Sequence, residues 1–283
     1  MPHAGIRPSS LKLEPMTRFL IVPQWQGSPS ARAMLLVDGA NAIAGDLPLK
    51  DTTVLDVPLE AGESLGTGVR RLSSLLRVRE LVTENMTDAG EQTVVIGGDC
   101  SVTVFALSAI DHADTAVLWC DAHPDLNDPS SSPSGSFSGM ALRAVLGEGE
   151  PQLALSPAVP ADRIVLLGAR SIDENEQDPL SRITTLTPED AQNPNVVVAA
   201  LRATGAARVW VHIDVDVIDP AEFEGVSDAA PFGIATGALV AAIKRLRGEL
   251  PLAGATISGF APRSPAHVVQ DMGAILRLIG AVA

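Results

Sequence analysis

Two short stretches carry most of the side chains that could do chemistry. They are Asp121-Ala122-His123-Pro124-Asp125 and Asp214-Val215-Asp216, and each follows an apolar run typical of a buried strand. In an extended chain, residues i, i+2 and i+4 point to one side, so we expect Asp121, His123 and Asp125 to converge. Crowded carboxylates are unfavourable unless a cation neutralises them, and mixed carboxylate and imidazole ligation suits Mn²⁺, Fe²⁺ or Zn²⁺.

A third stretch has the same layout. Val94-Val95-Ile96 is followed by Gly97-Gly98-Asp99-Cys100-Ser101, which indicates a strand, a tight turn and the start of a helix. Three strands would therefore each end in potential ligands. Ligands in open α/β sheets bind beyond the carboxyl ends of the strands, so the sequence predicts one metal site along a single sheet edge.

The elements that must position these residues alternate along the chain. We expect strands over residues 19–23, 54–57, 94–97, 116–121, 163–167, 183–186, 209–214 and 255–258. Helices are expected over residues 30–44, 69–84, 101–110, 196–203, 237–246 and 265–279, with a short one ending at Leu180. This alternation predicts an α/β fold with a mostly parallel sheet and helices on both faces. No linker divides the chain, so we expect one domain over residues 1–283, with residues 1–16 as a loose lead-in.

Composition excludes several classes of partner. A formal charge of −14 argues against binding nucleic acid or an anionic membrane surface. The charge would suit a cationic substrate, although an ordinary acidic surface is the favoured explanation. No apolar run approaches the roughly 20 residues of a membrane span, and the N-terminus lacks an apolar signal core. We therefore expect a cytoplasmic protein. The two cysteines, Cys100 and Cys120, are too few for a disulfide framework.

The three stretches together resemble the signatures of the ureohydrolase superfamily, which includes arginase, agmatinase and formiminoglutamase. The signatures Gly-Gly-Asp-His-Ser, Asp-Ala-His-x-Asp and Asp-x-Asp-x-x-Asp-Pro correspond to residues 97–101, 121–125 and 214–220. The resemblance covers nearly the whole chain. It implies a three-layer α/β/α architecture, two Mn²⁺ ions bridging a hydroxide, and a homo-oligomer, commonly a trimer or hexamer.

The resemblance also implies a set of metal ligands. Asp121 and Asp214 match the bridging ligands, Cys100 and Asp125 would complete one ion, and His123 and Asp216 would complete the other. In the family, the hydroxide attacks a guanidinium carbon, and urea and an amine are released. Asp125 matches the carboxylate that orients the hydroxide and relays a proton.

Three further residues match positions that contact the substrate in arginases, and a fourth candidate lies close to them. Asn127 and Ser134 fall where the substrate's α-carboxylate is held, and Asp173 where its α-ammonium is held, with Glu176 one turn further on. Together they favour an α-amino acid over a decarboxylated amine such as agmatine. Asn127 and Ser134 are also common loop-forming residues, which is an equally good explanation for them.

Three residues depart from the family pattern. Cys100 replaces a histidine ligand, and a softer thiolate gives Zn²⁺ or Fe²⁺ a relative advantage over Mn²⁺. A buried cysteine beside an empty or single-metal site is the alternative explanation. Ser138 replaces the histidine that shuttles protons to the leaving group, which serine cannot do near neutral pH. Gly259 replaces a glutamate that holds the guanidinium, and Asp228 on a neighbouring loop is a candidate to compensate.

His212 is open to two interpretations. It lies two residues before Asp214 and could replace the missing proton shuttle as a catalytic residue. Because it lies about 6 to 7 Å further back along the strand, a supporting or core role is the favoured alternative.

The sequence leaves three functions open. The first is a dinuclear-metal amidinohydrolase acting on an arginine-like or modified guanidino amino acid, such as an N-hydroxylated guanidine with a leaving nitrogen that is easier to expel. The second is a non-catalytic homologue whose metal site is structural or senses a ligand. The third is hydrolysis of another C–N bond, of the agmatinase or formiminoglutamase type.

Overall fold

The chain folds around one parallel β-sheet. A computed structural model describes residues 17–86 and 92–283, so the predicted lead-in over residues 1–16 lies outside the described residues. Eight strands pair side by side in the order β2-β1-β3-β8-β7-β4-β5-β6, and every pairing is parallel. Their bounds are β1 Thr17–Val22, β2 Thr52–Val54, β3 Gln92–Gly97, β4 Thr115–Cys120, β5 Ile164–Leu167, β6 Thr184–Leu186, β7 Arg208–Asp214 and β8 Leu252–Ser258.

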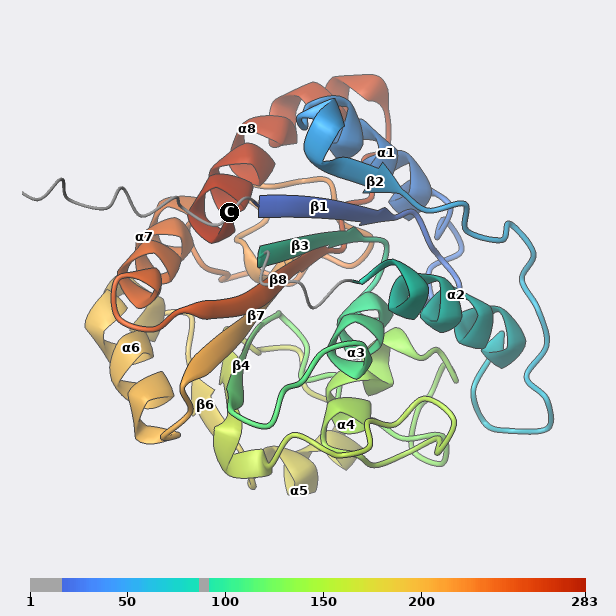
Figure 1. Ribbon diagram of the computed structural model, residues 1–283, viewed down its shortest axis with the longest axis horizontal. Coiled ribbons are helices and arrows are strands. Elements are labelled where there is room, and N and C mark those ends of the chain that lie inside the picture. Colours follow the sequence, from blue (N-terminus) through green and yellow to red (C-terminus); the bar gives the residue numbers. More distant parts are fainter. Residues whose placement is uncertain (1–16, 87–91) are drawn as a thin grey trace, which may run out of the picture.

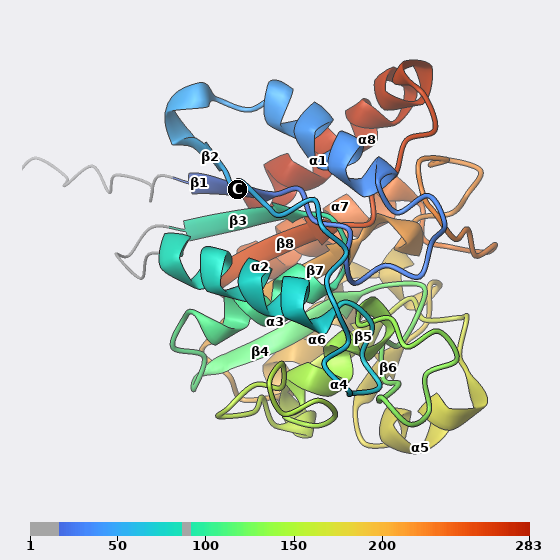
Figure 2. The same ribbon diagram turned by 90° about the vertical axis from the view of Figure 1, so that its right-hand side faces the viewer.

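Helices cover both faces of the sheet and make three layers (Figure 1). Helices α1, α6, α7 and α8 pack on one face, and α2, α3 and α4 on the other. Figure 2 shows α1 and α8 on one side of β1, β3 and β8, with α2 and α3 on the opposite side. The bounds are α1 Leu35–Gly45, α2 Leu72–Asn85, α3 Ser101–Ser108, α4 Ala141–Val145, α5 Gln177–Leu180, α6 Pro194–Ala203, α7 Thr236–Arg247 and α8 Pro265–Val282.

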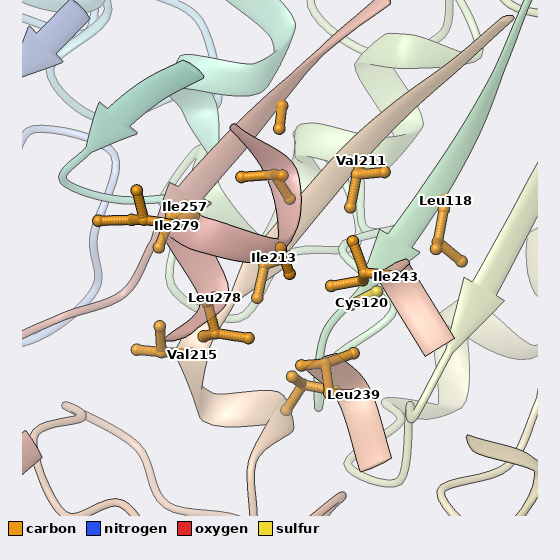
Figure 3. Close-up of a cluster of buried hydrophobic side chains, with 14 of the residues drawn as sticks. Leu118, Cys120, Val211, Ile213, Val215, Leu239, Ile243, Ile257, Leu278 and Ile279 are labelled. Atoms are coloured by element: carbon orange, nitrogen blue, oxygen red, sulfur yellow. The ribbon is translucent and has the colours of Figure 1, made fainter. Parts of the chain in front are cut away.

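Each face of the sheet has its own apolar core because successive strand residues point to opposite faces. In β7, Val211 and Ile213 pack toward α7 and α8, where they meet Leu239 and Ile243, as Figure 3 shows. Trp210 directly precedes Val211, points to the opposite face and belongs to the core under α2, α3 and α4. Central strands buried on both faces read as continuous apolar runs, which is why the sequence alone located them.

The predicted fold class is confirmed, and most element boundaries agree within a few residues. Helix α1 begins at Leu35, five residues after the predicted start. Strand β2 was expected over residues 54–57 and is found at Thr52–Val54. Pairing with β1 decides this, since Phe19 is in register with Thr52 and Ile21 with Val54. Leu55 and Val57 are buried, which explains their apolar character, but they lie beyond the paired segment.

The strand order determines what meets at the edge of the sheet. Strands β3, β8, β7 and β4 are adjacent and parallel, so their carboxyl ends lie side by side. The residues that follow or close these four strands, Asp99, Gly259, Asp214 and Asp121, therefore come from four distant parts of the sequence to one place.

Among the described residues, no helix is long and apolar enough to cross a membrane.

Candidate metal centre

A cavity of about 450 Å³ opens at the carboxyl edge of the central strands. This volume lies in the range typical of small-molecule sites. Twelve of the residues singled out from the sequence line it: Cys100, Asp121, His123, Asp125, Asn127, Ser134, Ser138, Asp173, Glu176, Asp214, Asp216 and Asp228. The predicted meeting of three strand ends thus corresponds to one site.

The first group of possible ligands lies at the outer part of the cavity floor. One ligand atom from each of Asp121, His123 and Asp216 lies within 4.8 Å of the others. His123 Nδ1 is 3.0 Å from Asp216 Oδ2 and 3.5 Å from Asp121 Oδ1. The imidazole keeps 28% of its side-chain surface exposed, so it faces the cavity.

The second group lies deeper and shares Asp121 with the first. Cys100, Asp121 and His212 also bring one ligand atom each within 4.8 Å of one another, and all three are buried. Cys100 Sγ lies 3.6 Å from Asp121 Oδ2 and 3.1 Å from Asp214 Oδ2. Ser258 Oγ donates to the same Asp214 oxygen at 3.2 Å, which fixes that carboxylate.

The convergence around Asp121 arises from turns and not from an extended chain. β4 ends at Cys120, and Asp125 has a left-handed backbone with φ of +54°. Side-chain carboxylates hold the turns, since His123 N donates to Asp121 Oδ1 at 2.7 Å and Ala122 N to Asp216 Oδ1 at 3.1 Å. Asp216 itself lies in a 3-10 turn, Val215–Val217, whose N-cap is Asp214. The prediction that Asp121, His123 and Asp125 come together is confirmed. The predicted cause is wrong, because turns bring them together and not the alternation of side chains along an extended chain.

Burial and mutual repulsion shift the pKa values of this cluster. Burial, and then the charges of Asp216 and Asp121, raise the pKa of Asp214 to about 8. Burial and Asp121 raise the pKa of Asp216 to about 6. Burial would lower the pKa of His123, but hydrogen bonds to Asp121 and Asp216 outweigh it and raise that pKa to about 12. Without a cation, the cluster therefore keeps protons that a metal would displace.

The residues present fit divalent metal ions. Asp125 Oδ2 and His212 Nε2 are buried and have no hydrogen-bond partner among the described residues. Buried polar atoms are usually paired, and these two unpaired atoms are both of types that bind metals and lie among the carboxylates of the cluster. The set of imidazole, carboxylate and thiol side chains is one that Mn²⁺, Fe²⁺ and Zn²⁺ accept.

The predicted substrate residues beside the metal ligands are tied to one another. Asn127 Nδ2 donates to Asp173 Oδ2 at 2.9 Å, and Asn127 Oδ1 accepts from Ser131 Oγ at 3.0 Å. Glu176 is buried, and its two carboxylate oxygens accept from the backbone N–H groups of Leu126 and Asp173, both at 2.9 Å. Glu176 thus fixes the loop, while the exposed Asp173 presents its carboxylate at the rim.

The remaining predicted residues lie around the mouth of the cavity. Ser134 Oγ accepts from Ser136 N at 3.1 Å, as a loop-forming serine would. Ser138 N donates to Gly27 O at 3.0 Å, which ties this loop to the segment after β1. Asp228 is 85% exposed and lies 3.8 Å from His123 Nε2. Gly259 has φ of +85°, and a Cβ atom there would overlap the Asp214 carboxylate.

His212 lies beneath the cavity floor and is fully buried. Its ring is tilted against Trp119 with centroids 3.8 Å apart, because the two residues are in register on neighbouring strands. Its Nδ1 is 2.7 Å from Thr103 Oγ1, on α3. This position favours a supporting role over contact with substrate.

Part of the cavity wall comes from residues that no sequence motif indicates. Ser28, Pro29 and Ser30, in the loop after β1, line the cavity, as do Val226 and Ser227. β1 is parallel to β3 and adjacent to it, so its carboxyl end must point to the same edge. Only the strand order places these residues at the cavity, and the strand order cannot be read from the sequence.

The fold and the site define a three-layer α/β protein with a two-part, acidic metal-ligand cluster at the carboxyl edge of its parallel sheet. Comparison with known proteins identifies the family. Residues 31–273 match the arginase family, and the chain belongs to that family.

Individual relatives show how divergent it is. The arginase of Staphylococcus aureus (strain MRSA252) is 31% identical over 190 residues, 62% of this chain and 63% of that enzyme, so less than two thirds of its length is matched. The N(omega)-hydroxy-L-arginine amidinohydrolase of Streptomyces lavendulae is 28% identical over 269 residues, 90% of this chain and 93% of that protein. The structure of Bacillus caldovelox arginase superposes with a TM-score of 0.81 at 24% identity, covering 95% of this chain and 98% of that one, which confirms the arginase fold.

Proposed function

We propose that this protein is a metal-dependent amidinohydrolase. It cleaves a guanidino C–N bond of an arginine-like or modified guanidino amino acid and releases urea or a urea derivative. The observation that carries this proposal is the pair of ligand groups that share Asp121 at the floor of a cavity of about 450 Å³. Family membership supplies the class of reaction.

The ligand sets would hold two divalent ions. His123, Asp121 and Asp216 form one set, and Cys100 with Asp121, Asp125 and Asp214 forms the other. Mn²⁺ is the first candidate by family resemblance, whereas the thiol of Cys100 favours Zn²⁺ or Fe²⁺ at the second set. When bound, such ions lower the pKa of water so that hydroxide is available near neutral pH.

The side chains of this protein would orient the reactants and move protons. Asp125 has an unpartnered buried oxygen beside the ligands and can hold a water molecule and accept its proton. Asp173 presents a carboxylate at the rim, positioned by Asn127 and by the loop that Glu176 fixes. A carboxylate there pairs with the α-ammonium of an amino acid.

Two features favour a modified guanidine over arginine itself. Ser138 lines the cavity but cannot deliver a proton to a basic leaving group near neutral pH. Gly259 offers no carboxylate to a guanidinium, and its conformation leaves no room for a side chain beside Asp214. A less basic leaving nitrogen, as in an N-hydroxyguanidine, needs neither group. A relative named for N(omega)-hydroxy-L-arginine hydrolysis, matched over 90% of this chain, supports this choice.

The test combines metal content with a substrate panel. The protein is loaded with Mn²⁺ or Zn²⁺, its metal is measured by elemental analysis, and urea or hydroxyurea release is followed from arginine, N-hydroxyarginine, agmatine and guanidino acids. Two metals per chain and preferential turnover of N-hydroxyarginine are expected. Preferential turnover of agmatine, or of a formimino compound added to the panel, would contradict the proposal and favour hydrolysis of the agmatinase or formiminoglutamase type.

The second candidate is a non-catalytic metal-binding homologue. The replacements at Ser138 and Gly259 are the observations that favour it, because both remove groups that act on substrate in the family. Two bound metals with no turnover of any guanidino or amidino compound would support that candidate.

The assembly and location of the protein belong to the same proposal. We infer a single catalytic domain over residues 1–283 that forms a cytoplasmic homo-oligomer, a trimer or hexamer, by family resemblance. Sedimentation analysis of the full chain tests the oligomer.

A further inference from the structure

The buried imidazole of His212 has one nitrogen satisfied and one free. Its Nδ1 lies 2.7 Å from Thr103 Oγ1, a hydrogen bond that the hydroxyl can accept. Its Nε2 is buried with no hydrogen-bond partner among the described residues. Leaving a buried polar atom unpaired is costly, so this nitrogen calls for a partner that the side chains around it do not supply.

The free nitrogen is aimed at two metal-capable groups. Nε2 lies 3.7 Å from Asp121 Oδ2, too far for a hydrogen bond, and Cys100 Sγ completes a triangle in which all three atoms are within 4.8 Å. Ligand atoms that share one ion lie roughly 3 to 4 Å apart, given bonds of about 2.0 to 2.3 Å. The triangle therefore has the size of a shared-ion site, and its one direct hydrogen bond, from Cys100 Sγ to Asp121 Oδ2, leaves His212 Nε2 unpaired.

The surroundings of the ring are those of a metal ligand. Histidine ligands usually donate their other N–H to an oxygen that fixes the tautomer, and Thr103 Oγ1 is placed to accept from Nδ1. Trp119, stacked at 3.8 Å between ring centroids, fixes the ring plane. Both contacts direct Nε2 toward the ligand cluster.

We propose that His212 Nε2 is an additional metal ligand in the set that contains Cys100, and that with Cys100 Sγ and Asp121, beside Asp125 and Asp214, it binds one divalent ion of thiophilic character, Zn²⁺ or Fe²⁺. The inference rests on the proposed function only in requiring that the protein binds metal. On binding, the Cys100 thiol loses its proton to solvent and the imidazole binds as the neutral Nδ1–H tautomer. The other ligand group, Asp121, His123 and Asp216, has no sulfur and suits Mn²⁺ better.

Cobalt(II) is a suitable probe because it substitutes for zinc and reports its ligands. The full chain, with ¹⁵N-labelled histidine, is loaded with Co²⁺ and its metal is counted. Absorption spectroscopy then detects a thiolate-to-cobalt band from Cys100, and ¹H NMR detects the shifted N–H signals of bound imidazoles. His212 is fully buried whereas His123 is 28% exposed, so the His212 signal should exchange slowly in D₂O and the His123 signal quickly.

Two variants complete the experiment. His212→Ala should abolish the slowly exchanging signal and weaken Co²⁺ and Zn²⁺ binding at this group by at least about 100-fold, since even supporting residues cost 10- to 100-fold. His112→Gln is the matched control, because His112 is buried but its nitrogens face the backbone carbonyls of Leu107, Ile110 and Pro157. It should leave the spectra unchanged. If His212→Ala does not fold, the slowly exchanging, shifted imidazole N–H signal of the wild-type protein decides the test.

The outcomes separate this inference from the proposed function. A thiolate band without a slowly exchanging, shifted imidazole signal would overturn the inference and leave the hydrolase proposal intact. The His212 signal without turnover of any substrate would uphold the inference and overturn the hydrolase proposal. Failure of the wild-type protein to retain Co²⁺, Zn²⁺ or Mn²⁺ would overturn both.

Discussion

Glu176 Oε1 accepts a hydrogen bond from the backbone N–H of Leu126 at 2.9 Å, and this contact joins the loops that follow β5 and β4. Both residues are buried. Glu176→Ala would leave the Leu126 N–H without an acceptor, so we expect the free energy of unfolding to fall by about 1 to 3 kcal/mol. Urea denaturation measures this change. Glu174→Ala, in the same turn but exposed, should change stability by less than about 0.5 kcal/mol. Equal losses in the two variants would refute the role of Glu176.

The contact between Thr103 and His212 provides a second test of the ligand group formed by Cys100, Asp121 and His212. Thr103→Val keeps the shape of the side chain and removes the acceptor for His212 Nδ1. We expect metal affinity at this group to fall by about 10- to 100-fold, because the imidazole loses its orientation and tautomer. Chelator competition measures the affinity. Thr115→Val is the control, since Thr115 is buried in β4 and its hydroxyl has no partner among the described residues. An unchanged affinity for Thr103→Val would contradict the prediction.

Gly259 leaves room for the Asp214 carboxylate. Gly259→Ala would place Cβ on that carboxylate in a backbone with φ of +85°, so metal retention should drop and stability should fall by about 1 to 3 kcal/mol. Thermal unfolding and elemental analysis measure the two effects. Gly237→Ala is the control, because its Cβ would meet open space in α7 and alanine favours a helix. Full metal retention by Gly259→Ala would contradict this prediction, because it would mean that the backbone shifts to make room for the new Cβ atom.

Metal binding should release protons. Near pH 7 the metal-free cluster holds a proton on Asp214, whose pKa is about 8, and one on His123, whose pKa is about 12. The Cys100 thiol, whose pKa is raised by burial and by the surrounding carboxylates, holds a third proton. Ligands must lose these protons, so roughly three protons per chain should be released when both ligand groups fill, and affinity should rise by about 10-fold per pH unit for each proton released. Calorimetry in buffers of different ionisation enthalpy counts the protons. A pH-independent affinity would mean that the carboxylates are already ionised.

The proposed function predicts that Ser138 limits the choice of leaving group. Ser138→His would place an acid at the cavity wall, and we expect turnover of arginine to rise by at least about 10-fold, since a positioned acid contributes 10²- to 10⁴-fold. Urea release measures it, with metal content as a check. Ser130→His is the control, because Ser130 is exposed on the same loop outside the cavity lining. If Ser138→His leaves arginine turnover unchanged while metal is retained, proton delivery is not the step that excludes arginine.

The sequence by itself determined the fold class and predicted most of the acidic residues that the structure brings together in the cavity. Central strands are buried on both faces, so their apolar runs are continuous and their ends are marked by the first polar residues, such as Asp121 and Asp214. Parallel strands share one carboxyl edge, so these ends had to meet. The class of site therefore followed from local patterns alone.

Only the tertiary structure decided which strands are neighbours and what lies between the layers. The order β3-β8-β7-β4 places His212 next to Trp119 and under Cys100, a relationship between residues up to 112 positions apart. It also turns Glu176 inward as a fixed support for Leu126 and brings the serines after β1 to the cavity. These contacts depend on strand order and side-chain packing across the sheet, and no local period in the sequence records either.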